Sequence, residues 1–171
     1  MPELYGWPYW SQLTDWTADG RPDENRYNNC LAECAAMCVS YVTSVELSAD
    51  YLHDRVKPEG YTGYLYTSDG VTMLSRWGGT PAEDYNANVD DTLSRVCSAL
   101  DDGRPTILLI RFNDNPDSGH FVAAVGYDDS GLILADPWGG WQRHMTWQDF
   151  GGWYKGWAIE VKRRRCLDVV G

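Results

Sequence analysis

The stretch RYNNCLAECAAMCVSY, residues 26–41, decides how the rest of the chain is interpreted. Asn29 is a favourable helix cap, and after it apolar residues recur every three or four positions among good helix formers. This pattern predicts a buried helix of about three turns. Three cysteines, Cys30, Cys34 and Cys38, then share one face of that helix, and the first of them lies at its beginning.

The position of each cysteine along the helix predicts its role. A cysteine attacks efficiently only as the thiolate, and the first turn of a helix favours negative charge because its N–H groups are unpaired. Cys30 alone among the five cysteines occupies such a place. Cys34 and Cys38 are predicted to pack as small apolar residues, and Cys97 and Cys166 are interpreted in the same way. All five are expected to be reduced, because cysteines four apart on a helix rarely meet disulfide geometry.

Length and charge limit the classes of protein that this chain can represent. A chain of 171 residues suits a single domain, which we expect over residues 1–165, with a tail or the start of a linker at 166–171. The net charge of −11 disfavours nucleic acids and anionic membranes as partners. The N-terminal stretch lacks the pattern of a signal peptide, and no stretch approaches the length of a membrane span. We therefore expect a protein that is made in the cytoplasm, and release from there to act on the cell wall is compatible with this expectation. A monomer is the favoured oligomeric state.

Helical patterns dominate the first half of the chain and strand patterns the second. Residues 1–29 are rich in aromatic residues without a sustained period, so an ordered loop held by these side chains is expected. Helices followed by antiparallel strands indicate an α+β fold. The further helices are predicted at 48–56, 68–77 (with Ser68 as cap), 89–101 and 146–150, and the strands at 106–112, 120–127, 132–137, 142–145 and 156–164.

A nucleophilic cysteine needs a base, and the chain holds three histidines. His53 lies on a helix face that is predicted to be exposed, and His144 lies between aromatic residues. His120 begins the apolar strand HFVAAVGY directly after the glycine-containing loop NDNPDSG, which places its ring at an accessible sheet edge. His120 is therefore the candidate base.

The next strand, in LILADPW, supplies Asp136 as a group that could orient the imidazole. An odd number of residues in the turn around DDS would put His120 and Asp136 on the same face of the sheet as diagonal neighbours. A two-residue turn would put them on opposite faces. Asp128 and Asp129 are interpreted as turn residues.

Acyl transfer also requires donors that stabilise an oxyanion. The backbone N–H of Cys30, at the start of its helix, is one candidate. The other is the side-chain amide of Gln12, which lies in the aromatic segment PYWSQLTDW and could be held rigidly there.

Taken in order, these features resemble the papain-like cysteine peptidases related to bacteriocin-processing (double-glycine leader) peptidases. The resemblance extends from about Pro8 to Val161 and is most specific in the block GHFVAAVGYD…GLILADPWGG. It implies a helical N-terminal half whose nucleophile helix packs on a C-terminal antiparallel sheet. Leu31 and Ala32 stand where these enzymes commonly have Gly-Pro, which predicts a different substrate cleft and an unusual specificity.

The resemblance also implies a role for each candidate residue. Cys30 would be the nucleophile, His120 the general base and then acid, Asp136 the orienting group and Gln12 the oxyanion donor, with no metal or cofactor. Soluble relatives include bacterial and phage cell-wall lysins, so a peptide or a peptidoglycan peptide is the expected substrate. Two alternatives remain open: a catalytically inactive binding or virion component, and an acyl-transferase that uses the same triad.

Metal binding is the less favoured interpretation of the remaining patterns. The Cys-x3-Cys-x3-Cys spacing lacks the paired two-residue spacing of zinc modules. Asp15, Asp19 and Asp23 suggest a calcium loop, but Arg26 occupies the twelfth position, where a glutamate belongs, so solvated turn residues are favoured. Of the nine tryptophans, most are expected in the core, and some of those that follow Asp136 could line the cleft.

Overall fold

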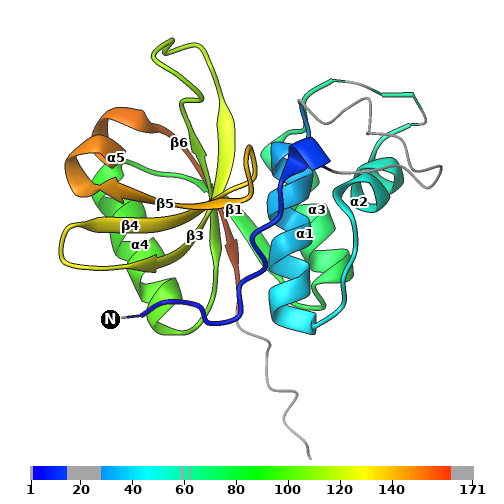
Figure 1. Cartoon of the computed structure of the whole chain (residues 1–171), viewed down its shortest axis with the longest axis horizontal. Coiled ribbons are helices and arrows are strands. Elements are labelled where there is room, and N and C mark those ends of the chain that lie inside the picture. Colours follow the sequence, from blue (N-terminus) through cyan, green and yellow to red (C-terminus); the bar gives the residue numbers. More distant parts are fainter. Residues whose placement is uncertain (1, 15–27, 59, 62, 163–171) are drawn as a thin grey trace, which may run out of the picture.

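The helix predicted around the cysteines is α1, Cys30–Thr43, in a computed structural model that describes residues 2–14, 28–58, 60–61 and 63–162 (Figure 1). Every residue from Leu31 to Val39 is buried, so this helix lies in the middle of the fold rather than on its surface. The predicted cap, Asn29, occupies the N-cap position but its side chain makes no capping hydrogen bond.

The other elements follow the predicted order, with two differences. Helix α3 begins at Thr67, and its first turn is closed by the Asp69 carboxylate, which accepts the Tyr66 N–H at 2.8 Å, so the prediction of Ser68 as cap is wrong. Strand β1 was not predicted, because this edge strand buries a single side chain, Tyr85, and has no apolar alternation. The elements are η1 (Gln12–Thr14), α2 (Ala49–Val56), α3 (Thr67–Trp77), β1 (Ala82–Asn86), α4 (Val89–Asp101), β2 (Thr106–Ile110), β3 (His120–Tyr127), β4 (Gly131–Asp136), β5 (Trp141–Thr146), α5 (Trp147–Trp153) and β6 (Tyr154–Val161).

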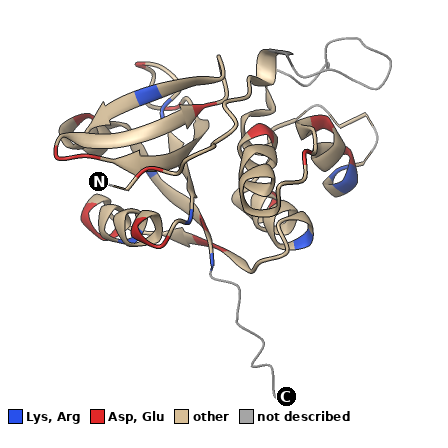
Figure 2. Ribbon diagram, turned by 60° about the horizontal axis from the view of Figure 1, so that its bottom comes forward, with Lys and Arg blue, Asp and Glu red and all other residues tan. Residues whose placement is uncertain are grey.

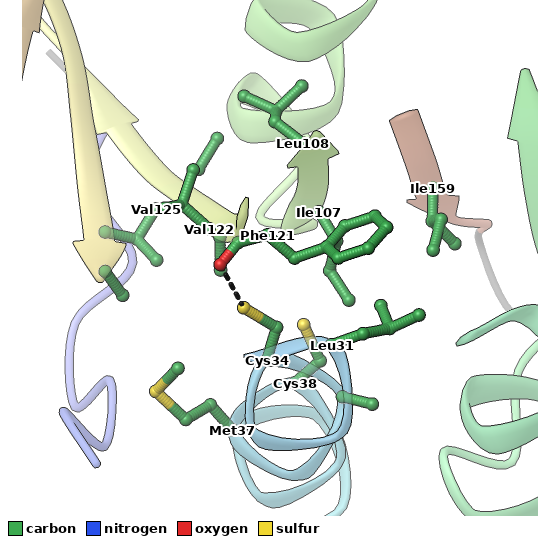
Figure 3. Close-up of a cluster of buried hydrophobic side chains, with 14 of the residues drawn as sticks. Leu31, Cys34, Met37, Cys38, Ile107, Leu108, Phe121, Val122, Val125 and Ile159 are labelled. Atoms are coloured by element: carbon green, nitrogen blue, oxygen red, sulfur yellow. Dashed lines mark hydrogen bonds between the residues drawn. The ribbon is translucent and has the colours of Figure 1, made fainter. Parts of the chain in front are cut away.

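Six antiparallel strands form one sheet in the order β1-β6-β2-β3-β4-β5. Helices α1 and α4 both contact β2 and β3. They cover opposite faces of the sheet, and α2 and α3 lie on the α1 side (Figure 1). The core between α1 and the sheet joins Leu31, Cys34 and Cys38 to Phe121 and Ile107 (Figure 3). The predicted α+β architecture, with the cysteine helix packed on an antiparallel sheet, is confirmed.

The N-terminal segment is tied to the sheet and then to α1. The Leu4 N–H donates to Val125 O at 2.7 Å, where β3 extends beyond β2. Further along, the Trp10 N–H donates to the sulfur of Met37 at 3.4 Å. The segment ends in η1, dark blue in Figure 1 and tan in Figure 2, which lies beside the N-terminal end of α1 in both views. The aromatic segment thus brings Gln12 to the end of α1 that carries Cys30.

A bulge in the β3–β4 hairpin decides where His120 and Asp136 point. The first residues that face each other across this hairpin are Tyr127 and Leu132, which are separated by an even number of residues. That register alone would send His120 and Asp136 to opposite faces of the sheet. A one-residue register shift at Val125 reverses this, so both side chains project from the same face as diagonal neighbours. The bulge, rather than an odd-numbered turn, meets the condition derived from the sequence.

The contact between the N-terminal segment and β3 requires a glycine at position 126. A β carbon there would lie 3.0 Å from Pro2 O and 3.2 Å from the α carbon of Glu3. We expect Gly126→Val to lower the free energy of unfolding by about 1–3 kcal/mol and to speed hydrogen exchange of the Leu4 amide. Gly151→Ala is the matched control, since nothing lies within 4 Å of its added carbon. Equal unfolding free energies for the two variants in urea would contradict this close packing.

Candidate active site

Cys30 is the first residue of α1, half-buried, at the edge of a cavity of about 600 Å³. The first backbone hydrogen bond of the helix runs from the Glu33 N–H to Asn29 O at 2.9 Å, so the N–H groups before Glu33 have no partner within the helix. The Asn29 side chain does not cap them. These N–H groups therefore favour negative charge at the thiol and at any oxygen bound beside it.

The imidazole of His120 lies between Cys30 and Asp136. Its Nε2 is 2.7 Å from Asp136 Oδ1, and the ring also forms a hydrogen bond with the Cys30 side chain. Because Nε2 is engaged by the carboxylate, Nδ1 is the nitrogen available to the thiol. Burial acts to lower the pKa of His120, but the hydrogen bonds with Asp136 and Cys30 outweigh it and raise the pKa to about 9. The imidazole is therefore held as imidazolium at neutral pH.

Asp136, at the end of β4, is buried and hydrogen-bonded on both oxygens. Oδ1 also accepts the Trp138 N–H at 3.0 Å, and Oδ2 lies 3.3 Å from a guanidinium nitrogen of Arg143. Burial acts to raise the pKa of Asp136, but the hydrogen bond with His120 and the nearby positive charges outweigh it and lower the pKa. The carboxylate is thus ionised and fixed in orientation.

Two residues of this arrangement were not predicted from the sequence. Arg143 lies on β5 opposite Leu134, one diagonal step from Asp136, and this placement follows from the strand register alone. Phe112 packs edge-on against His120 and Trp138, with ring centroids 5.2 and 4.8 Å apart respectively. Phe112 shields the imidazole from solvent, which leaves His120 3% exposed.

Gln12 is fully buried at the start of η1. Its backbone N–H donates to Pro137 O at 2.7 Å, directly after Asp136, and the preceding Ser11 hydroxyl donates to Trp138 O at 3.3 Å. A β carbon on Gly140 would lie 2.9 Å from the Ser11 backbone nitrogen, so a glycine permits this close approach. The Gln12 segment is therefore packed against the turn that follows Asp136.

The remaining thiols occupy different surroundings from Cys30. Cys34 and Cys38 are buried in the core, and the Cys34 thiol donates to Phe121 O at 3.4 Å (Figure 3). Burial, the largest cause, raises the pKa of both thiols well above the ordinary range. These two cysteines pack as predicted. The described cysteines, which also include Cys97, are free thiols, and Cys166 lies outside the described residues.

The other histidines are distant from this chemistry. His53 is buried, so the prediction of an exposed face is wrong: its ring lies 6.0 Å from that of Tyr61, on a helix that packs against α1. His144 is partly exposed and pairs with Asp128 at 3.1 Å in the β3–β4 turn.

Within the described parts of the chain, no three histidine, cysteine or acidic side chains are grouped closely enough to hold a metal ion. The candidate calcium residues Asp15, Asp19 and Asp23 lie outside the described residues. Over the same described parts, the helices lack the combination of length and apolar character that a bilayer crossing requires.

Comparison with known proteins agrees with the resemblance found in the sequence. Residues 6–160 match the family model described as Peptidase_C39 like family. No curated protein sequence is significantly similar to the chain.

Solved structures share the fold at low sequence identity. A protein described as a C39-like peptidase from Bacillus anthracis is 14% identical with a TM-score of 0.63, over 96% of this chain and 98% of its own. The peptidase domain of Streptococcus ComA, a bifunctional ABC transporter, is 16% identical with a TM-score of 0.61, over 80% and 93%. A double glycine motif protease from an AMS/PCAT transporter, solved in complex with a leader peptide, is 17% identical with a TM-score of 0.58, over 78% and 84%. Because the family model matches residues 6–160, the chain belongs to the C39-like peptidase family, and this membership supports the activity of a cysteine peptidase.

Proposed function

We propose that this protein hydrolyses peptide bonds with Cys30 as nucleophile, His120 as base and acid, Asp136 as the orienting group and Gln12 as oxyanion donor. The observation that carries the proposal is the buried imidazole, which Asp136 binds on one side and the Cys30 side chain on the other. An imidazole beside a thiol can accept its proton, and the resulting thiolate is the form that attacks carbonyl carbon.

Acylation begins when the Cys30 sulfur attacks the carbonyl carbon of the scissile bond and the carbonyl π electrons move to oxygen. The Cys30 backbone N–H and the Gln12 side-chain amide donate to the resulting oxyanion. His120 then donates its proton to the leaving nitrogen, the C–N bond breaks, and a thioester to Cys30 remains. Asp136 stays ionised throughout and keeps the ring oriented.

Deacylation uses the same groups in reverse. Neutral His120 removes a proton from water as the water oxygen attacks the thioester carbon. The C–S bond breaks, the carboxylic acid leaves, and the Cys30 thiolate is restored beside protonated His120. No step requires a metal or a redox cofactor.

The alternatives differ in the fate of the thioester. An acyl-transferase would resolve it with an amine, so product masses measured with and without an added amine separate transfer from hydrolysis. An inactive binding or virion component would form no thioester. Cell-wall peptides are a further candidate substrate for the same chemistry, and loss of turbidity of bacterial walls, compared with a Cys30→Ser variant, tests them.

Selective alkylation tests Cys30 independently of any substrate. We expect iodoacetamide at mildly acidic pH to modify Cys30 faster than Cys34, Cys38 or Cys97, because imidazolium and helix N–H groups stabilise its thiolate, whereas burial opposes ionisation of Cys34 and Cys38. Peptide mass mapping over time measures each rate. Equally slow modification of all the thiols would favour the inactive alternative.

The raised pKa of His120 can be tested through its carboxylate partner. Asp136→Asn removes the charge that stabilises imidazolium, so the pKa of His120 should fall from about 9 toward its ordinary value near 6.5. NMR titration of the imidazole measures this change. Because His120 loses its positive charge when it deprotonates, kcat/KM of the wild type should decline as pH rises through about 9. In Asp136→Asn the same decline should occur at a lower pH.

Asp128→Asn is the matched control for this titration. It removes the carboxylate beside His144 in an exposed turn, and it should leave the His120 titration unchanged. An unaltered His120 pKa in Asp136→Asn would contradict the role given to Asp136.

The oxyanion role of Gln12 predicts a loss in kcat. Gln12→Ala should lower kcat by about 10²–10³-fold with little change in KM, because the interaction forms only as charge develops on oxygen. Stopped or continuous assays on a fluorogenic peptide measure both constants. A change confined to KM would show that Gln12 binds substrate instead, and retention of selective Cys30 alkylation would show that the variant remains folded.

A further inference from the structure

The cavity that begins at Cys30 is mainly apolar. Its floor and sides are formed by Leu31 of α1, Leu65 before α3, Leu109 of β2 and Phe121 of β3. Leu31, Leu65 and Phe121 are themselves buried, so the cavity extends into the hydrophobic core. With a volume of about 600 Å³, it lies within the range of small-molecule and side-chain binding sites.

Exposed aromatic side chains form the rim of this cavity. Tyr64 and Tyr66 are each 70% exposed, and Trp157 and Phe112 are each 38% exposed. Together with the apolar sides, they form a continuous apolar surface next to the proposed nucleophile. Such a surface is costly to leave in water and marks a site that a ligand covers.

One rim of the cavity is held in place by polar contacts. The Tyr61 hydroxyl donates to Tyr64 O at 2.7 Å, and the Tyr66 N–H donates to the Asp69 carboxylate at 2.8 Å. Lys57 pairs with the same carboxylate at 3.1 Å. The backbone that carries the tyrosine rim is therefore held in place before a ligand binds, which lowers the entropy cost of binding.

The opposite rim is fixed by Lys155. Its amine donates to Ser118 O at 2.6 Å and to Pro116 O at 3.1 Å, so its hydrogen bonds are directed to the loop rather than into the cavity. The Thr67 hydroxyl is likewise engaged, with Asp84 at 2.9 Å. With these groups engaged, and with Asp117 exposed on the loop between β2 and β3, the interior is suited to an uncharged, apolar ligand.

We propose that this cavity binds a large apolar side chain, aliphatic or aromatic, of the substrate residue beside the scissile bond, a specificity that rests on the proposed peptidase function. A peptide whose carbonyl carbon lies at the Cys30 sulfur has the α carbon of the same residue only about 1.5 Å from that carbon. The side chain on this α carbon therefore begins next to the cavity, which Cys30 lines. A glycine at this position would leave the apolar surface uncovered.

Two measurements on one peptide set test the cavity. The set consists of quenched-fluorescence peptides with an Ala-Ser background, in which each position in turn carries Gly, Leu, Phe or Asp. We expect kcat/KM for the best Leu or Phe peptide to exceed that of its Gly counterpart by roughly 10–200-fold. The same order of preference is expected in the dissociation constants of the Cys30→Ala variant, which binds without turning over.

Substitutions on the rim link this preference to the cavity. Tyr66→Ala and Trp157→Ala should each reduce the ratio of Leu or Phe over Gly several-fold. Tyr5→Ala, at a still more exposed tyrosine that does not line the cavity, should leave the ratio unchanged.

The outcomes separate this specificity from the peptidase function itself. Cleavage in which Gly equals or exceeds Leu and Phe at every position overturns the specificity and leaves the hydrolase intact. Binding by Cys30→Ala that prefers Leu or Phe, without cleavage by the wild type, upholds the cavity and overturns the hydrolase. Neither cleavage nor discriminating binding overturns both.

Discussion

The hydrogen bond between His120 and Asp136 is the interaction on which the proposed chemistry depends. At 2.7 Å, and with the two residues 3% and 5% exposed, it holds an ionised carboxylate against an imidazolium away from water. Removing one partner from such a buried pair leaves an uncompensated charge, which typically costs about 3–5 kcal/mol. The pair is supported by Arg143 and the Trp138 N–H on one side and by the Phe112 ring on the other. The sheet therefore presents a preformed base.

The scaffold joins parts of the chain that are far apart in sequence around that pair. The bulge at Val125 decides which side chains of β3 and β4 share a face of the sheet. The backbone oxygen of the same residue accepts a hydrogen bond from Leu4 of the N-terminal segment. That segment then passes α1 and delivers Gln12 beside the turn after Asp136. Helix α1 contributes Cys30 from its first turn, while its buried face fixes it against the sheet. A single packed core thus fixes the positions of the proposed nucleophile, base and oxyanion donor.

Much of this arrangement could be predicted from sequence because its signals are local. The spacing of apolar residues after Asn29 predicts α1, and the apolar run HFVAAVGY predicts β3. The expectation that His120 lies at an accessible edge is wrong, since this residue is 3% exposed. Features that depend on pairing were not predictable in the same way. The bulge at Val125 and the diagonal placement of Arg143 follow from strand register, and the burial of His53 follows from packing of α2 on α1. The roles of Cys30, His120, Asp136 and Gln12 remain predictions, which substitution of each residue tests.

The central claim is that Cys30 is the nucleophile and that His120 acts as its base. The most direct test is mass spectrometry of the protein after incubation with an activated peptide ester, with Cys30→Ser and His120→Ala as the compared variants. The account predicts an acyl group added to Cys30 in the wild type, none added at this position in Cys30→Ser and far slower addition in His120→Ala. Equal acylation of the wild type and Cys30→Ser, or none in either, would contradict it.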